Sequence, residues 1–337
     1  MPTRAEPKAG SSSPGASASP DTTVLLVNMG GPSSLVEIEP YLRAIFEDPA
    51  ILPVPAPLRR ALGWWIARRR APKVAERYRR IGGGSPLPEW TRKQVACVAR
   101  ALTEQGSTWR VAHAFRYCSP TIAEALGTEA RTGSRRIVLL PLFPHHADAM
   151  SGSIEREARR AAGLLGLDLQ VVGAWADRPE ILALWRRLLG HAIERAGPQA
   201  RVLFVAHGIP ERNVRRGEDY PARVADTARK LAEGLGPEHA WALAFQSRLG
   251  PLRWTGPYLE QEIDRLGHCG LPVVLAPLSF VAECLETSYD LDLVATEQAH
   301  AAGVAEVVRM SAFNDDPDFG RALARLAAEH FREVSND

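Results

Sequence analysis

Short apolar segments rich in β-branched residues alternate with amphipathic helical segments along almost the whole chain. Eight segments are predicted to form β-strands, at residues 23–27, 109–115, 136–142, 169–172, 202–206, 241–245, 273–278 and near 304–310. Ala- and Arg-rich segments with helical periodicity lie between them, at residues 94–102, 153–165, 179–195 and 220–235. Because strands that alternate with helices form parallel βαβ units, we predict an α/β fold.

The order of these elements predicts two Rossmann-like lobes, and 337 residues are enough for both. Four predicted strands precede residue 175 and four follow it, so the lobes are expected at residues 22–175 and 176–332. Each lobe should contain a mainly parallel four-stranded sheet flanked by helices. No sequence repeat relates the two halves, and the symmetry is inferred from element order alone. A cleft between two such lobes is the expected ligand site.

The composition, 45% apolar and 24% charged residues, is typical of a globular protein in water. The net charge of +2 gives no indication of nucleic-acid binding, and no partner of that kind is expected. No apolar run approaches the ~18–20 residues that cross a bilayer. Residues 1–21 are rich in Pro, Ser, Ala and Gly and lack the apolar core of a signal peptide, so they are predicted to be a disordered tail. The four cysteines show no metal-binding spacing, and we expect reduced thiols in the cytoplasm.

An acidic segment follows the strand predicted at residues 273–278. If a helix begins there, a rotation of ~100° per residue places Glu283, Glu286 and Asp290 on one face and Asp292 on the opposite face. Three like charges on one face repel each other, which is tolerated most easily where that face meets a cation, a metal or protons in transit. The alternative is a solvated helix face. The position at the carboxyl end of a strand favours a ligand site.

Histidines also follow predicted strands. His207 ends the strand at residues 202–206 and is followed by Gly-Ile-Pro, a position that suits proton transfer or metal contact better than a structural role. His145 and His146 follow the strand at residues 136–142, and we expect both at a lip or on the surface.

Residues 50–73 contain Trp64 and Trp65 beside a basic cluster of three arginines and a lysine. Tryptophans next to basic residues suit a membrane surface or an amphipathic anionic ligand. The alternative is a core helix with a solvated basic end. Three further segments are rich in glycine or proline and could be binding loops or ordinary turns, at residues 28–32, 78–86 and 246–257.

Taken together and in order, these motifs resemble those of the ferrochelatases, the enzymes that insert ferrous iron into a porphyrin at the end of haem synthesis. The matching motifs are Asn28-Met-Gly-Gly-Pro32, Tyr78-Arg-Arg-Ile-Gly-Gly-Gly-Ser-Pro86, Phe115-Arg-Tyr117, His207-Gly-Ile-Pro210, Gln246-Ser-Arg248 with Trp254, and residues 283–292. The resemblance covers residues 23–330.

The resemblance implies chelatase-type lobes with porphyrin in the cleft between them. It implies catalytic and metal-contacting roles for His207 and Glu286, and a proton or iron relay through Glu283 and Asp290. The residues that it places at the porphyrin are Met29, Arg69, Arg70, Tyr78, Ser85, Arg116, Tyr117 and Trp254. Residues 50–73 would form a lip at the pocket mouth, where Trp64 and Trp65 could touch a membrane.

Three positions depart from the patterns of some relatives. Asp148 stands where relatives with an animal-type [2Fe–2S] cluster have a cysteine, and the chain lacks their C-terminal extension, so we expect no such cluster and no tightly bound cofactor. Cys284 replaces a histidine that often accompanies the acidic segment. Met29 stands where relatives that use coproporphyrin have tyrosine, which favours protoporphyrin IX.

The expected substrates are therefore a porphyrin and Fe²⁺, in a cytoplasmic monomer or homodimer with peripheral contact at the inner face of the cell membrane as a further expectation. The alternatives are a ferrochelatase for coproporphyrin III, a cobalt chelatase of the same fold, a non-catalytic porphyrin- or haem-binding protein, and a carrier for a small anion.

Overall fold

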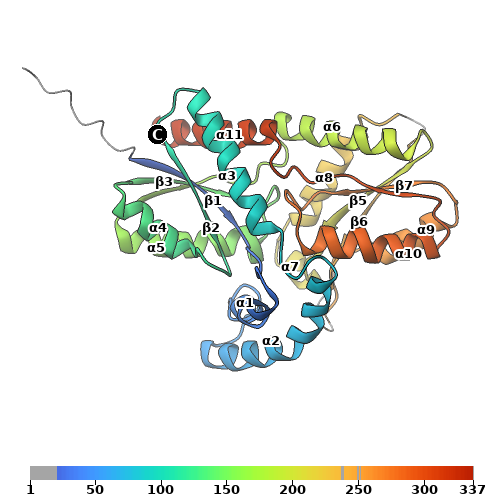
Figure 1. Ribbon diagram of the computed structural model, residues 1–337, viewed down its shortest axis with the longest axis horizontal. Helices are drawn as coiled ribbons and strands as arrows, with labels where there is room; N and C mark the ends of the chain where they lie inside the picture. The colour runs from blue at the N-terminus through green and yellow to red at the C-terminus, as the bar shows by residue number, and fades with distance from the viewer. Residues whose placement is uncertain (1–20, 237–238, 249, 251, 337) are drawn as a thin grey trace, which may run out of the picture.

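The computed structural model describes residues 21–336 except 237–238, 249 and 251. The predicted tail, apart from Asp21, lies outside the described residues. In the described part, two sheets of four parallel strands each stand side by side (Figure 1). This arrangement confirms the predicted α/β fold.

The first sheet has the order β2-β1-β3-β4. Its strands are β1 (Thr22–Asn28), β2 (Arg110–Phe115), β3 (Arg136–Pro141) and β4 (Asp168–Val171). Every residue of β1 is buried, because this central strand is paired on both sides and covered on both faces of the sheet.

The second sheet repeats this topology with the order β6-β5-β7-β8. Its strands are β5 (Arg201–His207), β6 (Trp241–Gln246), β7 (Val273–Pro277) and β8 (Val307–Arg309). His207 pairs with Gln246 at the last position of the β5–β6 register. All eight strands lie where the apolar segments predicted them.

Helices cover both faces of each sheet. In the first half of the chain they are η1 (Leu35–Glu37), α1 (Ile38–Phe46), α2 (Ala56–Arg79), α3 (Leu87–Glu104), α4 (Ile122–Arg131), the π-helix η2 (Asp148–Gly152) and α5 (Ser153–Leu165). In the second half they are α6 (Pro179–Ala196), α7 (Glu211–Arg215), α8 (Tyr220–Ala232), α9 (Leu259–Gly267), the π-helix η3 (Glu286–Ala295), α10 (Thr296–Ala301) and α11 (Pro317–Asn336). The four segments predicted to be helical lie in α3, α5, α6 and α8.

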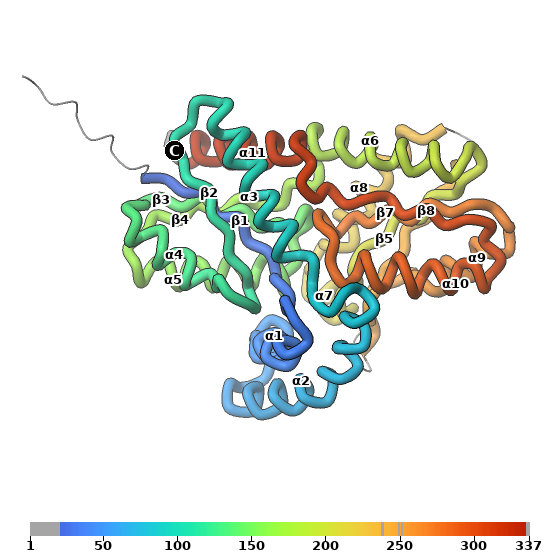
Figure 2. The backbone as a smooth tube through the Cα atoms, in the orientation of Figure 1, coloured from blue at the N-terminus to red at the C-terminus, as the bar shows by residue number. Residues whose placement is uncertain are grey.

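Helices α1 and α2 project beyond the two sheets (Figures 1 and 2). They pack on each other through a separate apolar cluster that includes Phe46, Ala67 and Tyr78. Gly63 permits this contact, since a Cβ there would lie 3.2 Å from the Phe46 backbone. Most of the predicted lip, residues 50–73, lies in α2, a single helix of 24 residues.

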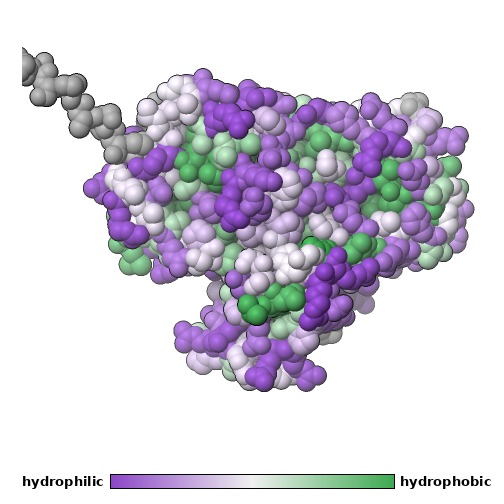
Figure 3. All heavy atoms as spheres, in the orientation of Figure 1, coloured by the Kyte–Doolittle hydropathy of each residue, from purple (hydrophilic) through white to green (hydrophobic). Residues whose placement is uncertain are grey.

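One apolar core joins the two lobes. It contains Val24 of the first sheet and Phe204 of the second, together with Trp185 of α6 and Phe319 of α11. Helix α11 belongs to the second half of the chain but packs against α3 of the first, where Gly320 lies directly over Cys97. The face drawn in Figure 3 is mainly hydrophilic with small apolar patches, as expected for a chain whose large apolar side chains are enclosed in such a core.

Candidate active site between the lobes

A cavity of about 1180 Å³ opens at the carboxyl ends of the strands. Met29 follows β1, Phe143 follows β3, His207 and Gln246 end β5 and β6, and Ser279 follows β7. Because the strands of each sheet are parallel, their carboxyl ends lie at one edge of that sheet, which is where open α/β sheets bind ligands. Helices α1 and α2 and the π-helix η3 supply the remaining walls.

Two contacts hold His207, one through its ring and one through its backbone. Its Nδ1 lies 2.7 Å from the carbonyl oxygen of Gly208. Its backbone N–H donates to Ser279 Oγ at 3.1 Å, and the Tyr220 hydroxyl lies 2.7 Å from the same Oγ. A carbonyl oxygen can only accept, so Nδ1 carries the proton and Nε2 of the neutral imidazole keeps its lone pair. The His207 ring is therefore oriented as a proton acceptor or metal ligand.

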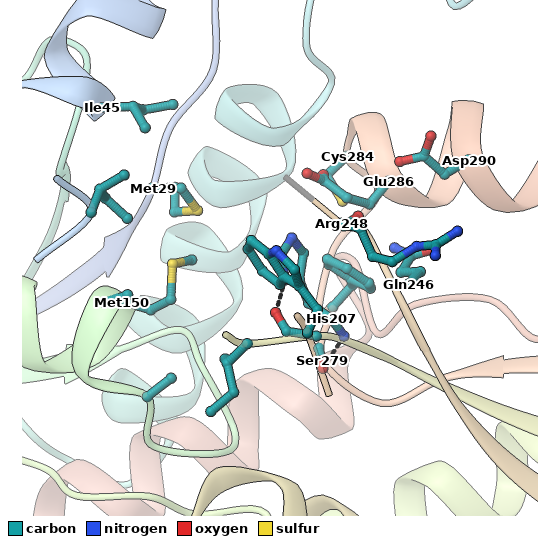
Figure 4. Close-up of a pocket in the computed structure, with 18 of the residues that line it drawn as sticks. Met29, Ile45, Met150, His207, Gln246, Arg248, Ser279, Cys284, Glu286 and Asp290 are labelled. Atoms are coloured by element: carbon teal, nitrogen blue, oxygen red, sulfur yellow. Dashed lines mark hydrogen bonds between the residues drawn. The ribbon is translucent and has the colours of Figure 1, made fainter. Parts of the chain in front are cut away.

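Glu286 and Asp290 share the wall formed by η3, as Figure 4 shows. Asp290 forms an ion pair with Arg77 of α2, whose guanidinium lies 4.9 Å from the centre of the Tyr289 ring. Burial raises the pKa of Asp290 from 3.8 to about 6, against the lowering effect of Arg77 and with a further rise from the charge of Glu286. Asp290 is thus a carboxyl group that can gain and lose a proton near neutral pH.

The expected alignment of Glu283 with Glu286 and Asp290 is wrong. Residues 281–284 are not helical, so Glu283 precedes the helix and does not line the cavity. Its Oε1 accepts a hydrogen bond from Arg309 Nη1 at 3.1 Å, and Arg309 also pairs with Asp292 at 3.2 Å. Arg309 lies on β8. Its ion pairs hold Glu283 and Asp292 near each other, on the side of residues 283–292 that faces away from the cavity.

Three of the residues expected at the porphyrin line the cavity: Met29, Arg70 and Trp254. Trp254 stands edge-on to His207, with ring centres 6.3 Å apart. Lys73 and Arg77 also line the cavity, so α2 contributes three cations to its wall.

The other five residues expected at the porphyrin do not line the cavity: Arg69, Tyr78, Ser85, Arg116 and Tyr117. Arg69 is exposed and stacks on Trp65, 5.2 Å from the ring centre. Tyr78 is buried in the α1–α2 cluster, where burial raises its pKa and Ser85 is a hydrogen-bond partner. Arg116 and Tyr117 bind the carboxylate of Asp48.

The environment of His145 differs most from the one that the sequence predicts. It is 3% exposed and lines the cavity, with Nε2 2.9 Å from Thr227 Oγ1. Burial lowers its pKa to about 3, so the ring is neutral. The expectation of a lip or surface position is confirmed for His146, which is exposed, and wrong for His145.

The sequence motifs do not include two other residues of the cavity, Ser279 and Arg77. Ser279 could have been found by the rule that located His207, because it follows the carboxyl end of a strand. No comparable signal marks Arg77, which reaches the cavity from the last turn of a basic helix.

A resident metal site is not formed by the described part of the chain. No group of three or more His, Cys, Asp or Glu side chains there is placed to hold an ion. His207 and Glu286, which both line the cavity, are of donor types that bind divalent ions. Among the described helices, none is long and apolar enough to cross a membrane.

The paired sheets and the cleft between them define a chelatase-type fold. The structure is similar to "SirB from Bacillus subtilis with Fe3+", with a TM-score of 0.56, 14% identity and coverage of 94% of this chain and 98% of that one. It is also similar to the sirohydrochlorin chelatase SirB from Bacillus subtilis subspecies spizizenii in complex with cobalt, with a TM-score of 0.52, 13% identity and coverage of 94% and 98%.

The ferrochelatase family model matches residues 21–331. Ferrochelatase from Synechococcus elongatus is 35% identical over 315 residues, which cover 91% of this chain and 81% of that protein. Ferrochelatase from Synechocystis is 34% identical over 319 residues, covering 92% and 82%. The chain belongs to the ferrochelatase family, and it is a metal-chelating lyase of haem synthesis.

The raised pKa of Asp290 predicts a particular pH dependence of stability. A carboxyl group whose pKa is higher in the folded chain than in the unfolded chain costs stability as pH rises from about 4 to about 6, and no more above that range. We therefore expect the parent to lose stability relative to Asp290→Asn between pH 4.5 and about 6.5, measured as the free energy of unfolding in urea.

The test compares how the free energy of unfolding changes with pH in each protein. A loss of stability that the unpaired Arg77 causes equally at every pH therefore does not affect the comparison. Asp226→Asn is the control, because Lys230 and Arg229 lower the pKa of Asp226 and keep it ionised over this range. Parallel curves for the parent and Asp290→Asn would contradict the raised pKa.

Proposed function

We propose that the chain inserts Fe²⁺ into protoporphyrin IX in this cavity, with His207 and Glu286 as the catalytic and iron-contacting residues. The observation that carries the proposal is the fixed tautomer of His207, which presents an acceptor nitrogen in the same cavity as Glu286 and Asp290. A cavity of about 1180 Å³ whose lining combines apolar side chains with many charged and polar ones suits a large flat macrocycle that carries propionates.

Metallation breaks two pyrrole N–H bonds and forms four Fe–N bonds, so two protons leave the porphyrin as Fe²⁺ enters. His207 Nε2 accepts a proton, and the hydrogen bond from Nδ1 to the Gly208 carbonyl stabilises the imidazolium that results. Glu286 and Asp290 pass protons or hydrated Fe²⁺ along the η3 wall, and the pKa of Asp290 near 6 suits both steps. Glu283 supports this wall through Arg309 rather than as a relay member.

Arg70 and Lys73 bind the porphyrin propionates at the rim of the cavity in this proposal. Binding energy gained there, and by Trp254 and Met29 at the ring, offsets the distortion of the macrocycle that exposes its nitrogen lone pairs. Tyr78, Ser85, Arg116 and Tyr117 act from behind the wall, by supporting the residues that touch the ligand, whereas Arg69 lies on the exposed face of α2.

Substitution of the catalytic pair tests this assignment. We expect His207→Ala and Glu286→Gln each to lower kcat for anaerobic Fe²⁺ insertion by about a hundredfold or more, because each removes a proton acceptor. Porphyrin binding, followed by fluorescence, should persist in both variants. His268→Ala changes an exposed histidine at the C-terminal end of α9, which does not line the cavity, and should match the parent. Insertion at the parent's rate in both site variants would leave a non-catalytic porphyrin-binding role as the better account.

Met29 supports protoporphyrin IX as the substrate. Its thioether is apolar and lies in the cavity with Ile45 and Met150, where it suits a vinyl group better than a charged propionate (Figure 4). One observation favours the alternative, coproporphyrin III, which carries four propionates. Three further arginines, Arg212, Arg248 and Arg253, also line the cavity.

The two substrates are distinguished by kcat/KM for Fe²⁺ insertion. We expect a preference of about tenfold or more for protoporphyrin IX, because a propionate at Met29 would lose its hydration without gaining a partner. Met29→Leu should keep this preference and Met29→Tyr should reduce it. If the parent instead prefers coproporphyrin III, we would assign Arg212, Arg248 and Arg253 to the binding of its additional propionates.

We propose no [2Fe–2S] cluster and a cytoplasmic location. Cys97, Cys118, Cys269 and Cys284 are all free thiols and come from separate elements, which suits a reducing compartment. Acid-labile sulfide in the purified protein would contradict the first statement.

The exposed face of α2 supports peripheral contact with an anionic membrane. Trp64 is 43% exposed and Trp65 is 50% exposed, and Arg68 and Arg69 stack on their rings at 5.5 and 5.2 Å. This combination places aromatic rings and positive charge where a lipid surface offers apolar and anionic groups.

Sedimentation with vesicles checks this contact. We expect binding to vesicles that contain phosphatidylserine and a loss of about tenfold in affinity for the variant with both Trp64→Ala and Trp65→Ala. Trp241→Ala is the matched control, because Trp241 is also 43% exposed but lies on β6 of the other lobe. Equal binding by all three proteins would contradict the contact.

A further inference from the structure

Asp48 is a buried carboxylate in the connection between α1 and α2, with only 3% of its surface exposed. Its Oδ1 accepts a hydrogen bond from the backbone N–H of Ala50 at 2.8 Å. Its Oδ2 accepts from the Tyr117 hydroxyl at 3.0 Å, pairs with Arg116 Nη2 at 2.7 Å, and is bound by the Ser153 hydroxyl. A charge buried this deeply is stable only with such partners, so its position is strongly specified.

These donors belong to the carboxyl edge of the first sheet. Arg116 and Tyr117 directly follow β2, and their backbone N–H groups donate to the carbonyl oxygens of Asn28 and Met29 at 2.9 and 3.1 Å. Ser153 opens α5 and accepts a hydrogen bond from Arg116 Nε at 2.8 Å. Asp48 thus links the α1–α2 connection to the residues that follow β2. These residues in turn hydrogen-bond to the end of β1, where Met29 enters the cavity.

The residues on either side of Asp48 form a wall of the cavity. Ile45 and Phe46 precede it, Ala50 and Ile51 follow it, and all four line the cavity. The Asp48 carbonyl accepts from the Ile51 N–H at 3.1 Å, which fixes the turn. A displacement of Asp48 therefore moves apolar groups that face the ligand.

We propose that Asp48 is a positioning residue for the porphyrin. It holds the wall formed by residues 45–51 against the first sheet, at the spacing that the macrocycle requires. Arg116 and Tyr117 act through Asp48 and not by contact with the porphyrin. This inference rests on the proposed function, since it takes the cavity to be the porphyrin site.

The same lobe contains a second buried ion pair that serves as a matched control. Glu129 Oε2 accepts from Arg110 Nε at 3.0 Å and from Thr23 Oγ1 at 2.9 Å. Its side chain is 13% exposed and that of Arg110 is 25% exposed, against 2% for Asp48 and 20% for Arg116. This pair lies at the opposite edge of the sheet, beside the first residues of β1 and β2, and does not line the cavity.

The experiment compares Asp48→Asn with Glu129→Gln in the full chain. Both variants remove one buried charge, so both should unfold at a lower temperature than the parent. We expect Asp48→Asn to raise the KM and the dissociation constant for protoporphyrin IX by about tenfold or more, because small misplacements of a binding wall are costly. Glu129→Gln should leave both constants within about twofold of the parent's values.

Tyr117→Phe and Ser153→Ala keep the test decisive if Asp48→Asn does not fold. Each removes one donor to Asp48 and leaves the ion pair with Arg116, so each should raise the same two constants by a smaller factor. Unchanged constants in all three variants, or equal changes in Glu129→Gln, would overturn the role of Asp48. A parent that does not bind protoporphyrin IX at all would instead overturn the proposed function.

Discussion

The parallel pairing of strands within each sheet is the constraint on which the site depends. Because β5 pairs with β6 and β7 in parallel, His207, Gln246 and Ser279 meet at one edge, although more than thirty residues separate each of them from the next. One apolar core, shared by both sheets through α6 and α11, then sets the distance between this edge and the corresponding edge of the first sheet. The cavity is the space left between two edges that the core holds in place.

Many charged side chains line that space, and specific protein contacts place several of the polar groups in and around it. His207 is fixed by a carbonyl oxygen, Asp290 is paired with Arg77 of the other lobe, and Glu283 is withdrawn by Arg309. Glu286 lines the cavity from the same helix as Asp290, and it is the η3 carboxylate that we propose to meet an incoming ion. Burial in the same wall raises the pKa of Asp290.

The projection formed by α1 and α2 presents different groups of side chains to solvent and to the cavity. Toward solvent, Trp64 and Trp65 stack with arginines, while toward the cavity Arg70 and Lys73 supply cations. Such a projection has a small apolar cluster of its own, so it needs polar anchors to hold its place over the cavity. Asp48 supplies one anchor at the first sheet, and Arg77 supplies another at η3.

The sequence by itself determined the strands, four of the helices and the location of His207, Glu286 and Met29, because periodicity and strand-end position are local properties. The tertiary structure alone decided which polar groups meet. Asp290 pairs with Arg77 across 213 residues, Glu283 with Arg309 across 26, and Tyr117 with Asp48 across 69. His145 is buried for the same reason, since Trp185 and Tyr220 cover it from elements distant in the chain. A side chain's local pattern fixes its element, but its direction follows from the partner that satisfies its charge, and only the folded chain supplies that partner.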